Sequence, residues 1–296
     1  AISNLNLEND SYFGWSYDII TQYGNYIYMV VGAPGKGAID TNDISEYNSH
    51  GNAYVFEFNG SRWSQKGSSL FGIMNAYLTV GNYDSTNSQF GYSVAINDEG
   101  TRVIVGARKF NEQLKDHSTT PKNLGGVFVF HWNDSDSDWD MSFSYTDDTE
   151  SGESSDSAEM GYSVAMSKSG DKHAWSAPFQ GKNKVVIWQY NNDTLSYEKI
   201  GQIENYGADG FGSNISFNNY NFKFISISYP EGNNNRGIVY TYQYKEDATE
   251  ITDKWVTPLI ENELSNVIEG ETENDKLSLV EFSNTSRKIM IASTEY

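Results

Sequence analysis

The chain has 296 residues, of which 38% are hydrophobic, and 40 acidic against 20 basic residues give a formal net charge of −20. A chain of this size and apolar content buries a large core, which excludes a mainly disordered protein. The negative charge repels phosphate backbones, so we expect no nucleic acid partner. We also expect no membrane span, because no apolar run approaches about 20 residues. The chain has no cysteine, which excludes disulfides and thiolate metal sites.

Short apolar segments with a common opening recur along the chain. In chain order they are FGWSYDI (13–19), FGYSVAI (90–96), MGYSVAM (160–166), FGSNISF (211–217) and a fainter copy, KLSLVEF (276–282). Their spacing indicates a repeated unit of about 65 residues with loops of uneven length.

Each copy continues into further apolar runs, separated by polar turns or a variable loop. The second runs are YIYMVVGAP, RVIVGAR, HAWSAP, FKFISISYP and KIMIAS, and the third runs are GNAYVFEF, GGVFVFHW, NKVVIWQY and RGIVYTYQY. The third runs align aromatic positions at Phe58, Trp132, Tyr190 and Tyr244, and at Phe56, Phe130, Trp188 and Tyr242. A fourth run then opens with Trp63, Trp139, Tyr197 or Trp255.

Runs of this length, rich in β-branched and aromatic residues and bounded by turn residues, predict strands. Four strands joined by turns and repeated in tandem are typical of β-propeller blades. We therefore predict an all-β fold, a single propeller domain of about five blades at residues 12–80, 88–150, 158–205, 209–262 and 274–296. The last blade is incomplete, so we expect residues 2–7 to help close the ring or a neighbouring chain to complete it. We expect residues 260–273 to form a short helix or a loop.

The Phe-Gly openings at 13–14, 90–91 and 211–212 and the Gly-Ala-Pro close at 32–34 carry a resemblance to a known family. With the degenerate closes at 106–108, 176–178 and 228–230, they resemble the FG-GAP-repeat β-propellers of integrin α-chain heads and many extracellular proteins. The resemblance covers nearly the whole chain and implies a location outside the cell or on the surface of a cell or particle. It indicates a fold more strongly than a function, because one fold serves many tasks.

The resemblance also implies calcium loops between the first two strands of a blade, where alternating acidic residues precede a glycine. Here the equivalent turns are NDEG (97–100), SKSGD (167–171), NNYN (218–221) and SNTS (283–286), which hold too few carboxylates. We therefore expect no cofactor. Weak candidates for Ca²⁺ lie in another turn, NDSDSDWD, where a solvated hairpin tip is the alternative: Asp134, Asp136, Asp138 and Asp140. We expect residues 147–159 to form an acidic, solvated linker between blades.

Catalytic motifs are missing from the sequence. The histidines His50, His117, His131 and His173 share no motif, and no nucleophile elbow or phosphate loop is found. We therefore expect no catalytic residues and no enzymatic activity. The alternative is a carbohydrate-active propeller enzyme with paired carboxylates in the central funnel. Asp18 is the single acidic candidate on the first strands of the four clear repeats, and it has no partner there.

These observations predict a non-enzymatic, surface-exposed module for binding, adhesion or structure. The long connections at 36–50, 109–124 and 230–236 join second and third strands, so they gather on one face of the blades. Loops on a rigid scaffold are where binding function concentrates. We expect a protein or glycan partner at that face, including in a larger assembly such as a virus particle or a cell-surface appendage.

Overall fold

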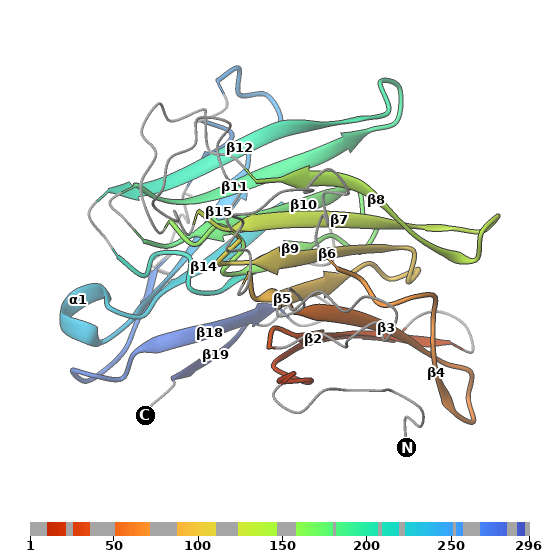
Figure 1. The fold of residues 1–296 in the computed structure, drawn as a ribbon. Coiled ribbons are helices and arrows are strands. Elements are labelled where there is room, and N and C mark those ends of the chain that lie inside the picture. Colours follow the sequence, from red (N-terminus) through yellow and green to blue (C-terminus); the bar gives the residue numbers. More distant parts are fainter. Residues whose placement is uncertain are drawn as a thin grey trace, which may run out of the picture. The chain divides into compact units, whose positions relative to one another are not determined.

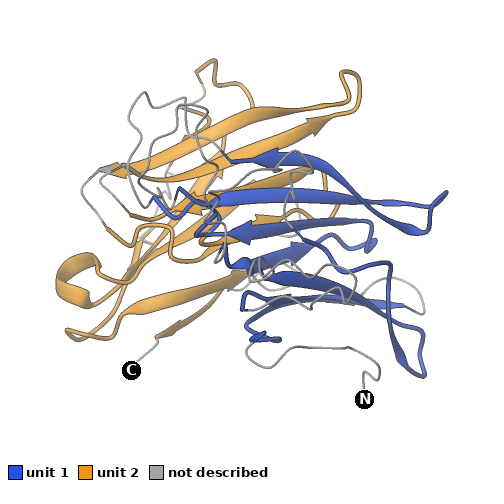
Figure 2. Cartoon of the chain, viewed as in Figure 1, with its two compact units in different colours: residues 1–161 blue, residues 162–296 orange. Residues whose placement is uncertain are grey.

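Over the residues it describes, the computed structural model is all-β apart from one short helical turn (Figure 1). It divides into two compact units, unit 1 (1–161) and unit 2 (162–296), which are treated separately (Figure 2). Within the chain, the structure describes residues 11–21, 26–35, 51–71, 88–110, 124–146, 158–179, 182–206, 209–218, 223–250, 253–256, 267–282 and 289–293. The expected strand at 2–7, most of the expected linker at 147–159 and the turn at 283–286 lie outside the described residues.

Unit 1 holds two four-stranded antiparallel sheets in which each strand pairs with the next along the chain. The first consists of β1 (Ser16–Thr21), β2 (Ile27–Ala33), β3 (Asn52–Phe58) and β4 (Trp63–Gln65). The second consists of β5 (Phe90–Ile96), β6 (Arg102–Ala107), β7 (Gly126–Asn133) and β8 (Asp138–Tyr145). This is the strand order expected of propeller blades.

Unit 2 continues the same pattern. One sheet consists of β9 (Val164–Met166), β10 (Lys172–Ala177), β11 (Lys182–Asn191) and β12 (Ser196–Tyr206). The next consists of β13 (Ile215–Phe217), β14 (Phe224–Tyr229), β15 (Ile238–Tyr244) and β16 (Trp255–Val256), with β17 (Val267–Glu269) also pairing with β15. A hairpin of β18 (Leu277–Phe282) and β19 (Ile289–Ser293) follows. Four-stranded antiparallel sheets are therefore confirmed, whereas the predicted count of about five blades, the last of them incomplete, is not.

Two local expectations differ from the structure. Within 260–273, Val267–Glu269 is a strand rather than a helix or loop, because it pairs with β15 from Ile238 to Tyr240. The connection at 230–236 contains the helical turn α1 (Gly232–Asn235), which the sequence analysis did not predict. Asn233 within it has a φ of 50°, in the left-handed region that asparagine tolerates better than most residues.

The aromatic positions that recur in the third and fourth strands face each other in the structure. Phe58 lies opposite Trp63, and Trp132 opposite Trp139, with 5.3 Å between ring centroids in each pair. In unit 2 the equivalent pairs, at 5.0 and 5.2 Å, are Tyr190–Tyr197 and Tyr244–Trp255. Cross-strand aromatic pairs of this kind stabilise a sheet beyond the area they bury.

The Phe-Gly and Gly-Ala-Pro motifs meet where the two sheets of unit 1 pack together. Gly91 has a φ of 88°, and a Cβ built on it would lie 2.4 Å from the carbonyl oxygen of Asn52. A Cβ on Gly32 would lie 2.0 Å from the carbonyl oxygen of Gly91, to which the hydroxyl of Ser16 donates a 2.9 Å hydrogen bond. Both glycines are required because backbones from two sheets approach each other here.

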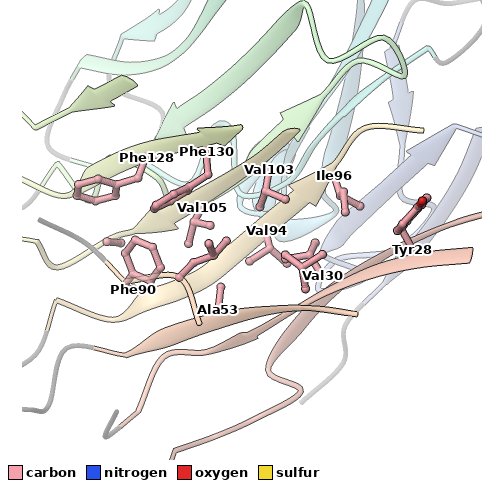
Figure 3. Packing of buried hydrophobic residues seen from close by; sticks show 13 residues of the cluster. Tyr28, Val30, Ala53, Phe90, Val94, Ile96, Val103, Val105, Phe128 and Phe130 are labelled. Atoms are coloured by element: carbon pink, nitrogen blue, oxygen red, sulfur yellow. The ribbon is translucent and has the colours of Figure 1, made fainter. Parts of the chain in front are cut away.

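Apolar side chains of both sheets form one core beside this contact. Val30 of β2 and Val55 of β3 belong to the same buried cluster as Val94, Val105 and the aromatic residues of the second sheet (Figure 3). In unit 2 a second cluster joins residues of β10 and β11 to residues of β13 and β14. Each sheet thus covers the apolar face of its neighbour within its unit, as a repeat fold requires.

Candidate functional site

A tight turn opens the first strand of each sheet in unit 1 and presents an aromatic side chain. The amide of Trp15 donates to the carbonyl of Tyr12, and the amide of Tyr92 donates to the carbonyl of Gln89, both at 3.0 Å. Tyr12 and Gln89 have φ values of 53° and 54°, so in both turns the residue just before the Phe-Gly pair has a left-handed conformation. The shared turn places Trp15 and Tyr92 at equivalent points of neighbouring blades.

The rings at these turns form a continuous aromatic surface. Tyr12 packs edge to face on Trp15 with 6.3 Å between centroids, and Trp15 lies 5.6 Å from Tyr92. The guanidinium carbon of Arg108 lies 4.1 Å from the Tyr92 ring centroid. We call these four residues the aromatic platform. Tyr12 and Trp15 are 62% and 56% exposed, which is unusual for large rings in contact with one another.

Polar groups border the platform through Arg108. Its Nε donates a 2.6 Å hydrogen bond to Oε1 of Gln89, and its Nη1 lies 3.1 Å from Oε2 of Glu159. These contacts hold the guanidinium plane against the ring of Tyr92. Arg108 stands where the first repeat has Pro34 in its Gly-Ala-Pro close. That departure from the motif was the only signal in the sequence for this part of the site.

The platform lies at the end of the sheets from which the longest connections leave. Ser16 pairs with Gly32, and Phe90 pairs with Ala107, so the strands β1 and β5 begin where β2 and β6 end. The connections after β2 and β6 therefore depart beside the platform, although most of their residues lie outside the described part of the chain. The platform thus belongs to the face that the sequence analysis assigned to binding.

Asp18 is half-buried on β1 and serves the packing between sheets. Its Oδ2 accepts a 2.9 Å hydrogen bond from the amide of Ile96. Burial raises the pKa of Asp18 to about 6; the hydrogen bonds from the amides of Ile96 and Ile19 oppose this shift, and the charge of Asp98 adds to it. Among the described residues of β1 and β5, Asp18 is the only carboxylate, so these two strands provide no second acid for the alternative of a carboxylate pair.

In the acidic hairpin between β7 and β8, most aspartate side chains accept hydrogen bonds from residues of the same hairpin. Asp134 accepts from the indole of Trp132, and Asp136 and Asp140 both accept from the amide of Asn133 at 3.0 and 2.8 Å. Asp138 instead accepts from the amide and hydroxyl of Ser68. Among the described residues no group of three or more acidic or histidine side chains is arranged to hold a metal. The four aspartates stay weak sequence-based candidates for Ca²⁺, with a solvated hairpin tip as the alternative.

Each of the two units holds one histidine within the described residues. His131 is exposed on β7, with Nε2 at 3.8 Å from Oδ2 of Asp140. His173 is buried on β10, where its ring packs 4.8 Å from that of Tyr197. His50 and His117 lie outside the described residues.

No family model matches the chain, and no curated protein matches it. Among solved structures, it is similar to the periplasmic gluconolactonase PpgL of Pseudomonas aeruginosa, at 12% identity and a TM-score of 0.50 over 96% of this chain and 65% of that one. It also matches Sqt1 of Saccharomyces cerevisiae, at 10% identity and a TM-score of 0.43 over 80% of this chain and 46% of that one. The chain thus spans about half to two thirds of the length of these structures.

The likeness to the gluconolactonase shows a fold of the β-propeller type. The same likeness overturns the prediction that the chain is not an enzyme. That prediction rested on the absence of catalytic motifs from the sequence. A propeller carries catalysis in the gluconolactonase, so missing motifs do not exclude activity here. Within the described residues, no helix has the length and apolar character needed to cross a bilayer.

Proposed function

We propose that this chain is a surface-exposed recognition module that binds a glycan on the aromatic platform. The observation that carries the proposal is the exposed pair of Tyr12 and Trp15, which continues into Tyr92 and Arg108. Exposed rings held in contact by a tight turn at the start of a strand lose little entropy on binding, which makes them effective anchors.

The chemistry of the platform suits a sugar. The apolar C–H face of a pyranose packs on an aromatic ring, while its hydroxyls need donors and acceptors at the ring's border. Trp15 offers such a ring, and Arg108, Gln89 and Glu159 provide polar groups at one side of it. The net charge of −20 disfavours anionic ligands, so we propose a neutral or cationic glycan.

The proposal also covers the type of repeat, the number of blades and the location of the protein. We propose that the repeats are of the FG-GAP type and belong to a five-bladed ring. We place the chain outside the cell or on a cell or particle surface, where adhesion or assembly requires a glycan receptor. The repeated Phe-Gly motif and the loop-bearing position of the platform support this setting.

A glycan array with the full chain, followed by calorimetric titration of each bound glycan, tests the proposal. Trp15→Ala removes the central ring and is expected to weaken binding about tenfold or more, as the loss of an anchor residue does. Tyr26→Ala is the matched control, because Tyr26 is 45% exposed but precedes β2 at the opposite end of the sheet. The control should bind as the wild type does.

Three results would change the assignment. An array without any bound glycan, together with a pull-down in which Trp15→Ala releases a captured protein, would replace the glycan by a protein ligand. Equal affinities of wild type and Trp15→Ala would remove the platform from the site. Mass spectrometry of the incubated glycan distinguishes binding from turnover, and a converted glycan would make the platform part of an active site.

A further inference from the structure

Two hairpin turns of unit 1 contain an asparagine with the same structural role. Asn59 follows β3 and Asn133 ends β7, so each stands directly after the aromatic position near the end of the third strand. The side-chain oxygen of Asn59 accepts hydrogen bonds from the amides two and three residues further on, both at 3.1 Å. That of Asn133 accepts the equivalent amides at 2.9 and 3.4 Å. The Oδ1 atom of the asparagine therefore closes both turns.

Each of these asparagines also begins an Asn-x-Ser sequence, which is the acceptor pattern for N-linked glycans. The pattern reads NGS from Asn59 and NDS from Asn133. The same acceptor pattern, with Ser or Thr in third place, also begins at Asn9, Asn192, Asn214 and Asn284. Asn59 and Asn133 form a matched pair, because they lie in one unit and at the same position of the repeat.

The side-chain nitrogens of the two asparagines differ in what they bind. Nδ2 of Asn133 donates to Oδ2 of Asp136 at 3.0 Å and to Oδ2 of Asp140 at 2.8 Å, so carboxylates engage both of its hydrogens. Nδ2 of Asn59 donates to no group among the residues that the structure describes, where only its Oδ1 is engaged. All three residues of the first pattern are exposed, whereas Asn133 is half-buried. The first turn therefore leaves free the atom at which a glycan is attached.

The chemistry of attachment has different consequences for the two turns. Nδ2 forms a bond to the anomeric carbon of a lipid-diphosphate-linked oligosaccharide, the bond from that carbon to the diphosphate oxygen breaks, and Nδ2 loses one proton. Oδ1 keeps its lone pairs, so a glycan on Asn59 removes none of the hydrogen bonds that close its turn. On Asn133 the modified nitrogen keeps a single hydrogen, so at least one of its two bonds to a carboxylate is lost. Hydrogen bonds to ionised acceptors are the stronger ones, so the same modification destabilises the second hairpin.

The turn at Asn59 stands away from the aromatic platform. Phe58 at the end of β3 pairs with Ile27 at the start of β2. The platform lies at the other end of this sheet, where β1 begins at Ser16 and β2 ends beside it. A glycan attached to Asn59 therefore projects from the end of the sheet that the platform does not use.

We propose that Asn59 is an acceptor site for an N-linked glycan and that Asn133, in the equivalent turn of the next sheet, is not. This inference rests on the location outside the cell that is part of the proposed function, because the acceptor pattern is used in secreted proteins. The transferase acts on the chain before it folds, so folding selects among modified chains. A glycan on Asn59 is compatible with every hydrogen bond of its turn, whereas one on Asn133 removes a bond that the folded hairpin makes.

Site-resolved mass spectrometry of the secreted full chain tests the proposal. The chain is exported from cultured animal cells behind a cleavable secretion signal, and its peptides are treated with peptide N-glycosidase in heavy-oxygen water. The heavy oxygen marks each asparagine that carried a glycan and distinguishes it from spontaneous deamidation, to which the Asn59-Gly60 pair is prone. We expect the label at Asn59 in most secreted molecules and at Asn133 in only a small minority.

Two variants serve as controls for the labelled peptide. Asn59→Gln removes the acceptor nitrogen from the pattern. Ser61→Ala removes the pattern and the 2.9 Å hydroxyl bond to Oδ1 of Asn59, but it leaves the bond from the Arg62 amide in place. Both variants should be secreted and should lose the label at position 59.

Two results would overturn the proposal. One is a secreted wild type without label at Asn59, and the other is equal labelling of Asn59 and Asn133. Because the added signal imposes export, neither result bears on the proposed location of the protein. Glycan binding on the platform is measured separately, with the chain produced in bacteria that attach no such glycan, so the two proposals fail independently.

Discussion

Replacing Gly91 by alanine tests the close approach between the two sheets of unit 1. The substitution adds one methyl group at a φ of 88°, where its Cβ would lie 2.4 Å from the carbonyl oxygen of Asn52 and 2.9 Å from the amide nitrogen of Ala33. Both atoms belong to backbone, so no side chain can rotate away from the clash. Gly14→Ala is the matched control, because its φ of 91° is nearly the same and no atom lies within 4 Å.

The two variants differ only in the contact between sheets. Alanine at positive φ costs about 1 kcal/mol in either position. At Gly91 the forced movement of backbone adds an overpacking cost of about 1–3 kcal/mol. We therefore expect Gly14→Ala to lower the free energy of unfolding by about 1 kcal/mol and Gly91→Ala by about 2–4 kcal/mol.

Urea denaturation followed by tryptophan fluorescence measures this difference. Losses that agree within about 0.5 kcal/mol for the two variants would refute the reasoning, because the strain would then come from φ alone.

Two further predictions concern charged groups of unit 1. The pKa of Asp18 is about 6 when folded against 3.8 when unfolded, so the stabilisation present at low pH is lost as pH rises through this interval. Relative to Asp18→Asn, whose side-chain oxygen still accepts the Ile96 amide, the wild type should lose roughly 2–2.5 kcal/mol between pH 4 and 7, and parallel stability curves would contradict this. The ammonium of Lys66 donates a 2.7 Å hydrogen bond to the carbonyl of Gly100 and lies 4.6 Å from the Trp132 ring centroid. Lys66→Met should therefore lower the melting temperature through a loss of about 1–2 kcal/mol, and an unchanged melting temperature would contradict the role.

Repeated features of the fold were predictable because the spacing of the repeats indicates which residues occupy equivalent positions. The pairs Phe58–Trp63 and Trp132–Trp139 stand at equivalent places of the repeat, and a short turn between two strands sets their register. The Phe-Gly motif also recurs with the repeat, and at Gly91 the structure places the backbone of the preceding sheet against it. In each case local sequence and repeat symmetry determine the structure together.

The site was less predictable because it depends on contacts that no motif encodes. Arg108 meets Glu159 across 51 positions of sequence, and neither residue belongs to a recognised pattern. Asp18 was visible as a lone carboxylate, but its bond to the Ile96 amide required the next sheet to be in place.

The proposed function depends on successive repeats stacking through their first strands, and amide hydrogen exchange tests this directly. The amides of Ile96, Ile215 and Val280 donate to side chains of the preceding repeat: Asp18, Ser163 and Asn214, respectively. We predict slow exchange at all three amides in the wild type, and fast exchange at Ile96 alone in Asp18→Ala. Exchange of these amides at the rate of unstructured peptide in the folded wild type would contradict the stacking of the blades.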